Sequence, residues 1–593
     1  MTPRPATIRD WLVVLLAGLA VSLPYLDKPF HIDDILYLRV ADQVLRTPFD
    51  PYQGVVLWDA KDGQPASLFL TDHNPPLWKY VQAGSLQSFA APERRGESER
   101  LLHGLQSIAV VLGALGVFQL ARRLTPFPVW ATLFILAAPF FLPGQNIMLE
   151  APVLCFAVWA VEFQCRAWTS PKGVIWAVIA GALLAAAVLT KYSAGVLLPI
   201  LALESVRRRR PGTLAFLVVP VAVLIAWGAW CTAMQGRPHL GAHGLAFDVG
   251  QWHYKVLNVL RLIGALQPLG MFLILAMVLD RGAQFSRRML SCGLLVGVAV
   301  AIGALDVWQA RYQSSLENAD VTLLQRGHFF LFTAHGVITL GTLVLASRTA
   351  PSPDDDAFLW IWIFAVAVFN VCCTPFNAVR HLLLFFVPLV FLAGRLLNRL
   401  GSPGLRWAAL AVSMFLGIGL AAADYQFADS SREIARSEVR GLVSERAALG
   451  RNVWFSANWG FVFYAQRAGA LPWVKNPDQF GLPSIQAGDL LVQPMMMSWT
   501  NLEAALPPGT NLEWVKHWQP MARVDGPVSM LGQLLRTISP GVNYYSIRAN
   551  ALPWEFLVMP VDPQDRNTGA LFAVPTLGDY RIYRVVPTAG ARS

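Results

Sequence analysis

Charged side chains that could act in catalysis occur at several widely separated places in the sequence. They are the adjacent acids Asp33 and Asp34, the acid Glu150, the base Lys191, and the pair Arg380 and His381. A carboxylate can accept the proton of an attacking nucleophile, and two neighbouring carboxylates can bind a divalent ion. The set therefore has the residue types for acid–base or metal-assisted chemistry if the fold brings them together.

Composition indicates what kind of fold must position these residues. The chain of 593 residues is 55% hydrophobic and only 14% charged, with a mean hydropathy of +0.46. Ordinary soluble proteins contain roughly 25% charged residues. We therefore predict a polytopic α-helical membrane protein. Its net charge of +10 marks cytoplasmic loops in such a protein, and we expect no nucleic-acid partner.

Apolar runs long enough to cross a hydrocarbon core of about 30 Å recur through the first 424 residues. They lie near 11–26, 104–121, 128–149, 151–165, 173–190, 192–206, 212–232, 262–279, 289–305, 327–347, 357–379, 381–400 and 407–424. The first run lacks a small-residue cleavage site and is interpreted as a retained span. We predict about thirteen transmembrane helices.

Basic residues predict the orientation, because Lys and Arg collect in cytoplasmic connections. They occupy every second connection: Arg4 and Arg9, Arg122 and Arg123, Arg166 and Lys172, Arg207 to Arg210, Arg281 with Arg287 and Arg288, Arg348, and Arg395 with Arg399 and Arg406. The N-terminus is then cytoplasmic. Residues 1–424 form the membrane domain, and residues 425–593 form a soluble periplasmic α/β domain.

Two regions outside the spans have recognisable patterns. The tail should contain a helix near 430–448, a strand at 452–459 followed by an aromatic-rich helix, and strands at 489–494 and 580–586. The large outer loop, 27–102, has apolar residues at helical spacing over 34–46, which predicts an amphipathic helix on the membrane surface. A second interfacial helix is expected near 77–90.

The predicted topology places all the candidate residues on the outer face. Ionisable groups beside lipid are costly unless they are paired or used, so we expect one cleft that contains both acids and bases. Structural explanations remain open for each residue. Acids at 33 and 34 suit a helix start, Glu150 could cap a helix, and Lys191 and Arg380 could extend to the interface. Isolated histidines, such as His73 and His381, are often structural.

Six segments resemble a known group of enzymes when they are taken in order. They are HIDDILYLRVADQVL, HNPPLWKY, ERLLHGLQSIAVVLGALGVFQLARRL, MLEAPVL, VLTKYSAGVLLPI and NAVRHLLLFFVPLVFLAG. Together they resemble GT-C glycosyltransferases of the protein O-mannosyltransferase and lipid A aminoarabinose transferase group, across residues 10–424. Departures include Asp34 where Glu is common, Glu150 in place of Asp, His73 where several members have Lys, and His381 in place of Tyr.

The resemblance implies a GT-C fold and a bacterial cytoplasmic membrane glycosyltransferase. Its donor would be a polyprenyl-phosphate-linked sugar, and its acceptor a lipid, glycan or protein on the outer side. Asp33 would be the catalytic base, and the substrate would contact Asp34, Tyr37, His73, Glu150, Lys191, Arg380 and His381. The sequence leaves metal dependence open, and Asp33 and Asp34 are the residues that could hold a divalent metal, Mg or Mn. The competing hypotheses are a transporter or lipid-linked sugar flippase, and a non-catalytic scaffold.

Overall fold

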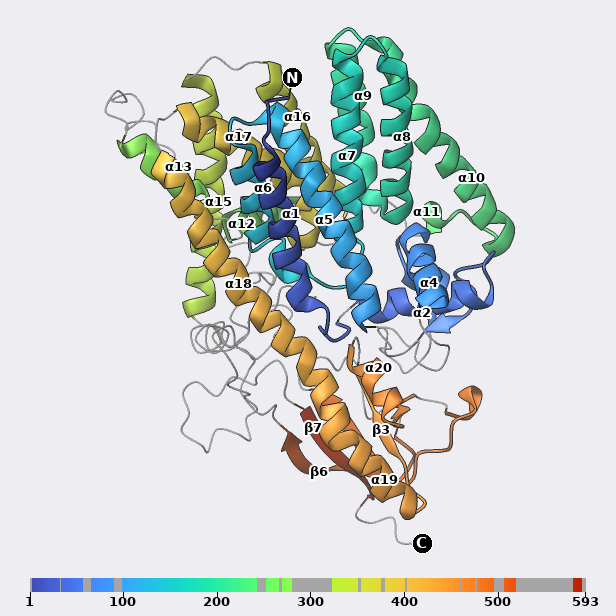
Figure 1. Ribbon diagram of the computed structural model, residues 1–593. Coiled ribbons are helices and arrows are strands. Elements are labelled where there is room, and N and C mark those ends of the chain that lie inside the picture. Colours follow the sequence, from blue (N-terminus) through green and yellow to red (C-terminus); the bar gives the residue numbers. More distant parts are fainter. Residues whose placement is uncertain are drawn as a thin grey trace.

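The protein is described by a computed structural model that is mostly helical (Figure 1). It describes the whole chain except residues 1–2, 32, 57–65, 90–98, 243–251, 266–268, 280–322, 350–353, 375–378, 400–402, 458–459, 475–476, 495–505, 519–579 and 589–593. The first described residues lie at one end of the helical part, and the last described residues lie beyond the other end.

The membrane part consists mostly of helices. They are α1 (Ile8–Ser22), α5 (Glu99–Leu124), α6 (Pro128–Ala137), α7 (Glu150–Thr169), α8 (Gly173–Thr190), α9 (Leu197–Arg207), α10 (Val218–Gln235), α11 (His239–Ala242), α12 (Trp252–Ala265), α13 (Leu269–Leu279), α15 (Leu323–Thr349), α16 (Asp354–Cys372), α17 (Leu383–Arg399) and α18 (Pro403–Ile434). Within the described ranges, seven helical segments are long and apolar enough to cross a membrane. The chain is therefore a multi-pass membrane protein.

Several predicted spans differ in detail from the helices. The run 128–149 is helical only to Ala137, because Pro139 and Pro143 lack the backbone N–H that a helix interior requires. The run 192–206 is a 3₁₀ turn, Tyr192–Val196, followed by α9. The run 289–305 lies outside the described residues. The total of about thirteen spans stays a prediction.

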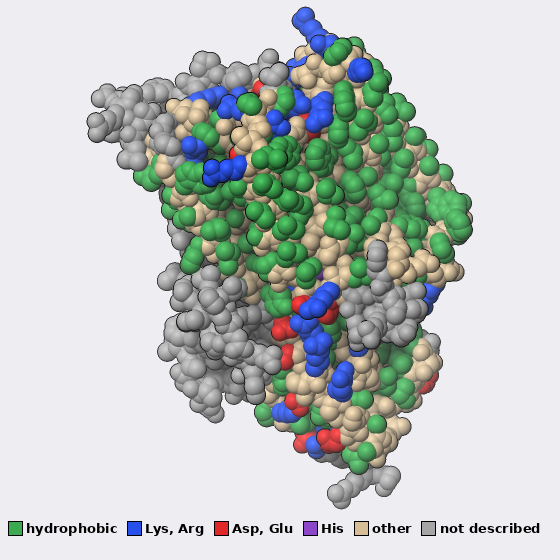
Figure 2. Space-filling view, viewed as in Figure 1, with side chains coloured by type: hydrophobic (Ala, Val, Ile, Leu, Met, Phe, Trp, Pro, Cys, Tyr) green, Lys and Arg blue, Asp and Glu red, His purple; other side chains and the backbone are tan. Residues whose placement is uncertain are grey.

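Close helix packing builds the core around α5, α7 and α8. A Cβ atom at Gly116 of α5 would lie 2.7 Å from a Val158 methyl group on α7, and one at Gly181 of α8 would collide with the Phe216 carbonyl oxygen. Only glycine allows the backbones to approach this closely. The hydrophobic side chains that remain outside form the green belt around the helices in Figure 2.

Basic residues gather at one end of the helices, at the top of Figure 2. Their ion pairs join Arg123 and Arg166 to Glu162, Arg207 and Arg208 to Glu204, Arg208 to Asp355, and Arg395 and Arg399 to Asp356. These residues belong to connections that the sequence assigned to a single side. The structure brings them together at one end of the bundle, opposite the loop that begins near residue 27.

The outer loop contains α2 (Asp34–Arg46), α3 (Leu68–Thr71), α4 (Leu77–Phe89) and a hairpin of β1 (Val55–Val56) and β2 (Ala66–Ser67). The predicted helices at 34–46 and near 77–90 are confirmed. The apolar face of α2 packs with α4, and Ile35, Ala41 and Val44 share a buried cluster with Ala83 and Leu86.

The tail has a five-stranded mixed sheet in the order β4-β3-β5-β7-β6. Its elements are β3 (Val453–Phe455), β4 (Leu471–Pro472), β5 (Leu490–Pro494), β6 (Thr510–Trp518) and β7 (Tyr580–Pro587), with helices α19 (Arg440–Ala448) and α20 (Gly460–Arg467). β3 pairs parallel with β4 and β5, whereas β7 is antiparallel to β5 and β6. Helix α18 runs past residue 424 to Ile434, so the predicted domain boundary falls inside one continuous helix.

Candidate active site

Asp33 is the N-cap residue of α2, but its side chain makes no capping hydrogen bond. Its carboxylate instead accepts a hydrogen bond from the Arg380 guanidinium, with an N–O distance of 3.2 Å. The Asp33 side chain is 19% exposed and that of Arg380 only 9%. The capping explanation therefore does not account for Asp33, which faces a cation contributed by a segment far away in the sequence.

Asp34 points elsewhere and is fully buried. Its carboxylate accepts a hydrogen bond of 2.9 Å from the backbone N–H of His31, so this acid secures the start of α2. Nearby, Lys28 and Asp424 form a buried ion pair of 2.5 Å that joins the loop to α18. The structure thus separates the two adjacent acids and gives Asp34 a contact within the protein rather than an open approach to substrate.

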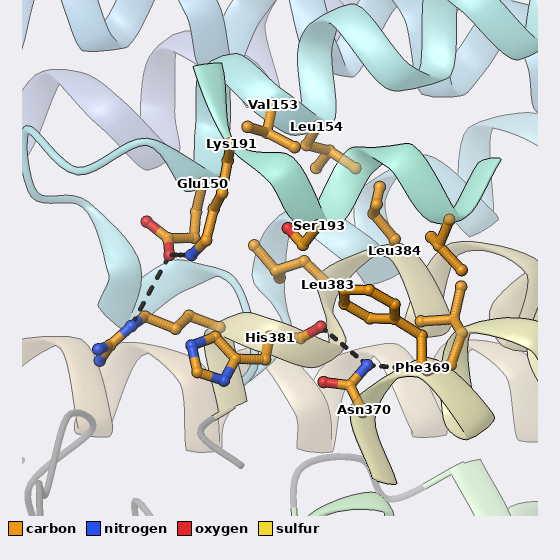
Figure 3. Close-up of a pocket in the computed structure, with 13 residues that line it drawn as sticks. Glu150, Val153, Leu154, Lys191, Ser193, Phe369, Asn370, His381, Leu383 and Leu384 are labelled. Atoms are coloured by element: carbon orange, nitrogen blue, oxygen red, sulfur yellow. Dashed lines mark hydrogen bonds and ion pairs between the residues drawn. The ribbon is translucent and has the colours of Figure 1, made fainter. Parts of the chain in front are cut away.

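Glu150, Lys191 and Arg380 form one ionic cluster. Glu150 begins α7 and Lys191 directly follows α8, whereas Arg380 lies in the 3₁₀ turn Val379–Leu382 before α17. Lys191 Nζ is 2.6 Å from Glu150 Oε1, and Arg380 Nε is 3.8 Å from the same oxygen. In Figure 3 the Glu150 and Lys191 side chains point toward each other. Neither cation simply extends to an interface, because both pair with acids.

A small pocket lies beside this cluster. Its polar lining consists of Glu150, Lys191, Ser193, Asn370, Arg380 and His381, and the rest is Val153, Leu154, Val196, Val366, Phe369, Leu383 and Leu384. Charged groups thus lie at one part of the pocket and aliphatic groups at another (Figure 3). Such a lining suits a ligand with an anionic head and an apolar chain.

The outer-loop motif places further groups close to Asp33. Tyr37 of α2 is buried, and the Lys79 ammonium lies 5.3 Å from the centre of its ring. Lys79 forms an ion pair with Asp72, and both side chains are fully buried. Sequence reasoning missed Asp72 and Lys79, although the neighbouring HNPPLWKY motif already marked this loop. The sequence did contain a signal for this pair, because Asp72 precedes the two prolines of the motif and Lys79 follows them.

His73 and His381 lie in different segments of the chain. His73 lies in the loop before α4, and His381 lines the pocket beside Arg380. Desolvation by the surrounding protein lowers the pKa of His73, and the neighbouring charges of Asp72 and Asp33 oppose this change. A contact between His73 and the substrate stays a prediction.

The environment of Asp33 favours proton acceptance. Burial raises the pKa of its carboxyl group, and the nearby Arg380 guanidinium only partly offsets that effect. Burial also raises the pKa of Tyr37 well above its usual value, and the negative charge of Asp33 adds to the rise. Asp33 is therefore more basic than an exposed aspartate, while Tyr37 stays protonated.

The predicted divalent metal site at Asp33 and Asp34 is not supported by this arrangement. The two carboxylates have different partners, Arg380 for one and the His31 backbone for the other. In the part of the chain that the structure describes, no group of three or more His, Cys, Asp or Glu side chains is close enough to hold a metal ion. The nearby residues fit an ion-pair cluster better than a ligand set for Mg²⁺ or Mn²⁺.

Residues 73–230 match the dolichyl-phosphate-mannose-protein mannosyltransferase family. This match confirms the predicted resemblance for the segment that contains His73, Glu150 and Lys191. Asp33 and Arg380 lie outside the matched residues, and only the fold connects them to this segment. No curated protein matches the chain.

Solved structures give more distant likenesses. ArnT from Cupriavidus metallidurans is 16% identical with a TM-score of 0.36, over 83% of this chain and 94% of that one. The Archaeoglobus fulgidus oligosaccharyltransferase is 14% identical with a TM-score of 0.34, over 78% of this chain and 62% of that one. The S. cerevisiae protein O-mannosyltransferase Pmt1–Pmt2 complex is 14% identical with a TM-score of 0.28, over 42% and 38%. The chain therefore spans less than two thirds of the archaeal and yeast proteins.

Proposed function

We propose that the protein is a membrane glycosyltransferase that moves a hexose or pentose from a polyprenyl-phosphate donor to an acceptor on the periplasmic side of a bacterial cytoplasmic membrane. The proposal rests on one observation. Ion pairs join Asp33, Glu150, Lys191 and Arg380 beside one partly apolar pocket. The family match to residues 73–230 supports the same reaction class.

Each group has a defined part in a single displacement with inversion. The acceptor hydroxyl attacks the anomeric carbon, and its proton passes to the Asp33 carboxylate. The bond between the anomeric carbon and the phosphate oxygen breaks, and polyprenyl phosphate leaves. Lys191 and Arg380 donate hydrogen bonds to the phosphate oxygens and stabilise the charge that develops there. Glu150 holds the two cations in place through its contacts with both.

The ion pair between Asp33 and Arg380 couples proton transfer to departure of the phosphate. A phosphodiester donor carries one negative charge, and the phosphomonoester product gains a second one. Asp33 becomes neutral as it takes the proton, which releases Arg380 from the 3.2 Å ion pair at the moment when the phosphate charge grows. The summed charge of Asp33 and the phosphate stays constant, and Arg380 binds the transition state more strongly than the ground state.

The position of the charges argues against the alternative of a transporter or flippase. Transporter sites usually lie near the bilayer midplane, between discontinuous helices. Here Glu150 begins α7, Lys191 ends α8 and Arg380 precedes α17, so all three lie at the helix ends opposite the basic connections. We infer that this end faces outward, that residues 1–424 supply the membrane domain, and that residues 425–593 form a periplasmic domain. The acceptor is a lipid, glycan or protein.

The experiment that tests this function measures binding and transfer with purified protein in liposomes. Binding uses undecaprenyl phosphate, and transfer uses undecaprenyl phosphate carrying a radiolabelled hexose or pentose, with delipidated cell envelope as acceptor. Arg380→Ala and Lys191→Ala should each weaken undecaprenyl phosphate binding about 10- to 100-fold, because a hydrogen bond to a charged group contributes about 1.5–3 kcal/mol. Arg380→Lys should restore binding only in part, since a point charge replaces a forked donor.

The matched control is Arg100→Ala. Arg100 belongs to the same outer face and pairs with Asp27, but its side chain is 78% exposed and lies outside the pocket. This variant should bind undecaprenyl phosphate as the wild type does. Unchanged binding in a folded Arg380→Ala protein would refute the phosphate site, and a wild-type protein that neither binds the lipid nor releases label would refute the function.

A further inference from the structure

The segment that carries Asp33 is held by a helix of the C-terminal domain. The Tyr464 hydroxyl of α20 accepts a hydrogen bond of 2.8 Å from the backbone N–H of Phe30, three residues before Asp33. The same hydroxyl donates to the Glu99 carboxylate at the start of α5. Phe30 is fully buried and Tyr464 is 7% exposed. Without Tyr464, a buried backbone donor and a partly buried carboxylate would each lose a partner.

Two further contacts fix the same helix against the loop. A Cβ atom at Gly460 would collide with the Phe30 carbonyl oxygen, so α20 and the loop backbone touch directly. The Phe463 ring packs edge-on against the Phe30 ring, with ring centres 5.1 Å apart. Backbone contact of this kind leaves no space for side-chain adjustment, and a shift of α20 must therefore move residue 30.

A third contact lies on the other side of Asp33. The Arg39 guanidinium of α2 donates a hydrogen bond of 2.7 Å to the Gln466 side-chain oxygen. Asp33 is thus bracketed between Phe30 and Arg39, and both are attached to the short helix Gly460–Arg467. Figure 1 shows α20 lying next to the outer loop, at the end of the helical part that is closest to the tail.

We propose that Tyr464, with Gly460 and Gln466, positions Asp33 for proton transfer, which makes the C-terminal domain part of the catalytic unit. The inference rests on the proposed function. Proton transfer requires the base within about 2.6–3.2 Å of its target, and a misplacement of about 1 Å can cost about 100-fold in rate. The phosphate site uses Lys191 and Arg380, which Glu150 holds together and which lie at the ends of membrane helices. The domain should therefore influence turnover more than donor binding.

The test is Tyr464→Phe in the liposome transfer and binding experiments. Turnover per folded molecule should fall about 10- to 100-fold, while the Kd for undecaprenyl phosphate should stay within about twofold of the wild type. The matched control is Tyr580→Phe, which removes another buried tyrosine hydroxyl of the same domain. Its hydroxyl is 3.0 Å from Ser431 Oγ, and the variant should keep wild-type turnover.

A second pair of variants covers the case in which Tyr464→Phe does not fold. Gln466 is only half-buried, and Gln466→Leu should lower turnover several-fold without changing lipid binding. Gln466→Glu keeps an acceptor for Arg39 and should restore turnover. A purely stabilising contact would change the melting temperature and leave turnover per folded molecule unaltered.

The outcomes separate this inference from the proposed function. Wild-type turnover in Tyr464→Phe, an equal loss of turnover in Tyr580→Phe, or parallel losses of turnover and lipid binding would overturn the positioning role. Each of these results leaves a transferring wild-type enzyme intact. A wild type that neither binds undecaprenyl phosphate nor transfers sugar would instead contradict the function itself.

Discussion

Replacing Asp33 by asparagine removes the proposed catalytic base while keeping the size of the side chain. General-base catalysis contributes about 100- to 10,000-fold in rate, so turnover in the transfer reaction should fall within that range. Donor binding should respond differently, because the Asp33 carboxylate also pairs with Arg380 at 3.2 Å. Asp33→Asn should therefore change turnover and donor binding by different amounts, because Asp33 both accepts the proton and pairs with Arg380.

The expected change in donor binding can be calculated from the ion pair between Asp33 and Arg380. Two unit charges about 4 Å apart interact by about 4 kcal/mol at an effective dielectric constant of about 20, before the cost of desolvation. In Asp33→Asn the side-chain amide would keep a dipole but no charge, and Arg380 would keep its 3.8 Å contact with Glu150. If one third of that interaction becomes available to the donor phosphate, binding tightens about tenfold, since about 1.4 kcal/mol corresponds to a factor of ten. Turnover and KM should thus fall together.

The pH profile adds an independent measurement. Burial raises the pKa of Asp33, and the charges that act on it are Arg380, Glu150, Lys191 and Asp72. A base works only when it is deprotonated, so wild-type kcat/KM should decrease as the pH falls through this raised pKa. The decrease should therefore occur at a higher pH than for an ordinary aspartate, whose pKa is about 3.9. This limb should be lost in the residual activity of Asp33→Asn.

The assay is sugar transfer by purified protein in liposomes, with undecaprenyl phosphate binding measured separately. Asp50→Asn is the matched control, because Asp50 lies in the same outer loop and accepts a hydrogen bond of 2.8 Å from the Gln235 amide. This control should keep wild-type turnover. Near-normal turnover in Asp33→Asn would remove Asp33 from the mechanism, and Glu150 would become the next candidate base.

Two other predictions concern the buried loop and the topology. Lys79→Met should destabilise the protein by about 3–5 kcal/mol, because it leaves the fully buried Asp72 charge unpaired. The double variant Asp72→Leu with Lys79→Met should regain much of that loss in a thermal unfolding experiment, and equal destabilisation of both proteins would contradict this explanation. Alkaline phosphatase fused after residue 593 should be active, because the tail after about residue 425 is predicted to be periplasmic. An inactive fusion together with a fluorescent cytoplasmic reporter at the same position would reverse the predicted side of every loop.

Local patterns in the sequence predicted several elements correctly. The helix expected at 34–46 has those bounds in the structure, because apolar residues at helical spacing need only one neighbouring surface to be buried. The strands expected at 489–494 and 580–586 pair with each other as β5 and β7. The strand expected at 452–459 is shorter, Val453–Phe455.

Local sequence patterns could not predict contacts between distant segments. The sequence singled out Asp34, but its carboxylate bonds to the backbone of His31 and not to a cation of the pocket. It did not single out Asp72 and Lys79, which form a fully buried pair. The local sequence around a charged residue does not show whether that residue is solvated, paired or catalytic. Its role depends on a partner that lies elsewhere in the chain.

By itself, the sequence determined the class of the protein, the positions of several membrane helices and which charged residues gather at the same end of the helices. These properties depend on the hydrophobicity of continuous segments and on the charge of short loops, which are local quantities. The tertiary structure decided which charges meet. Arg380 reaches Asp33 across 347 residues of chain, and Tyr464 reaches Phe30 across 434. Such contacts depend on how the helices pack, and packing is a property of all the facing side chains together.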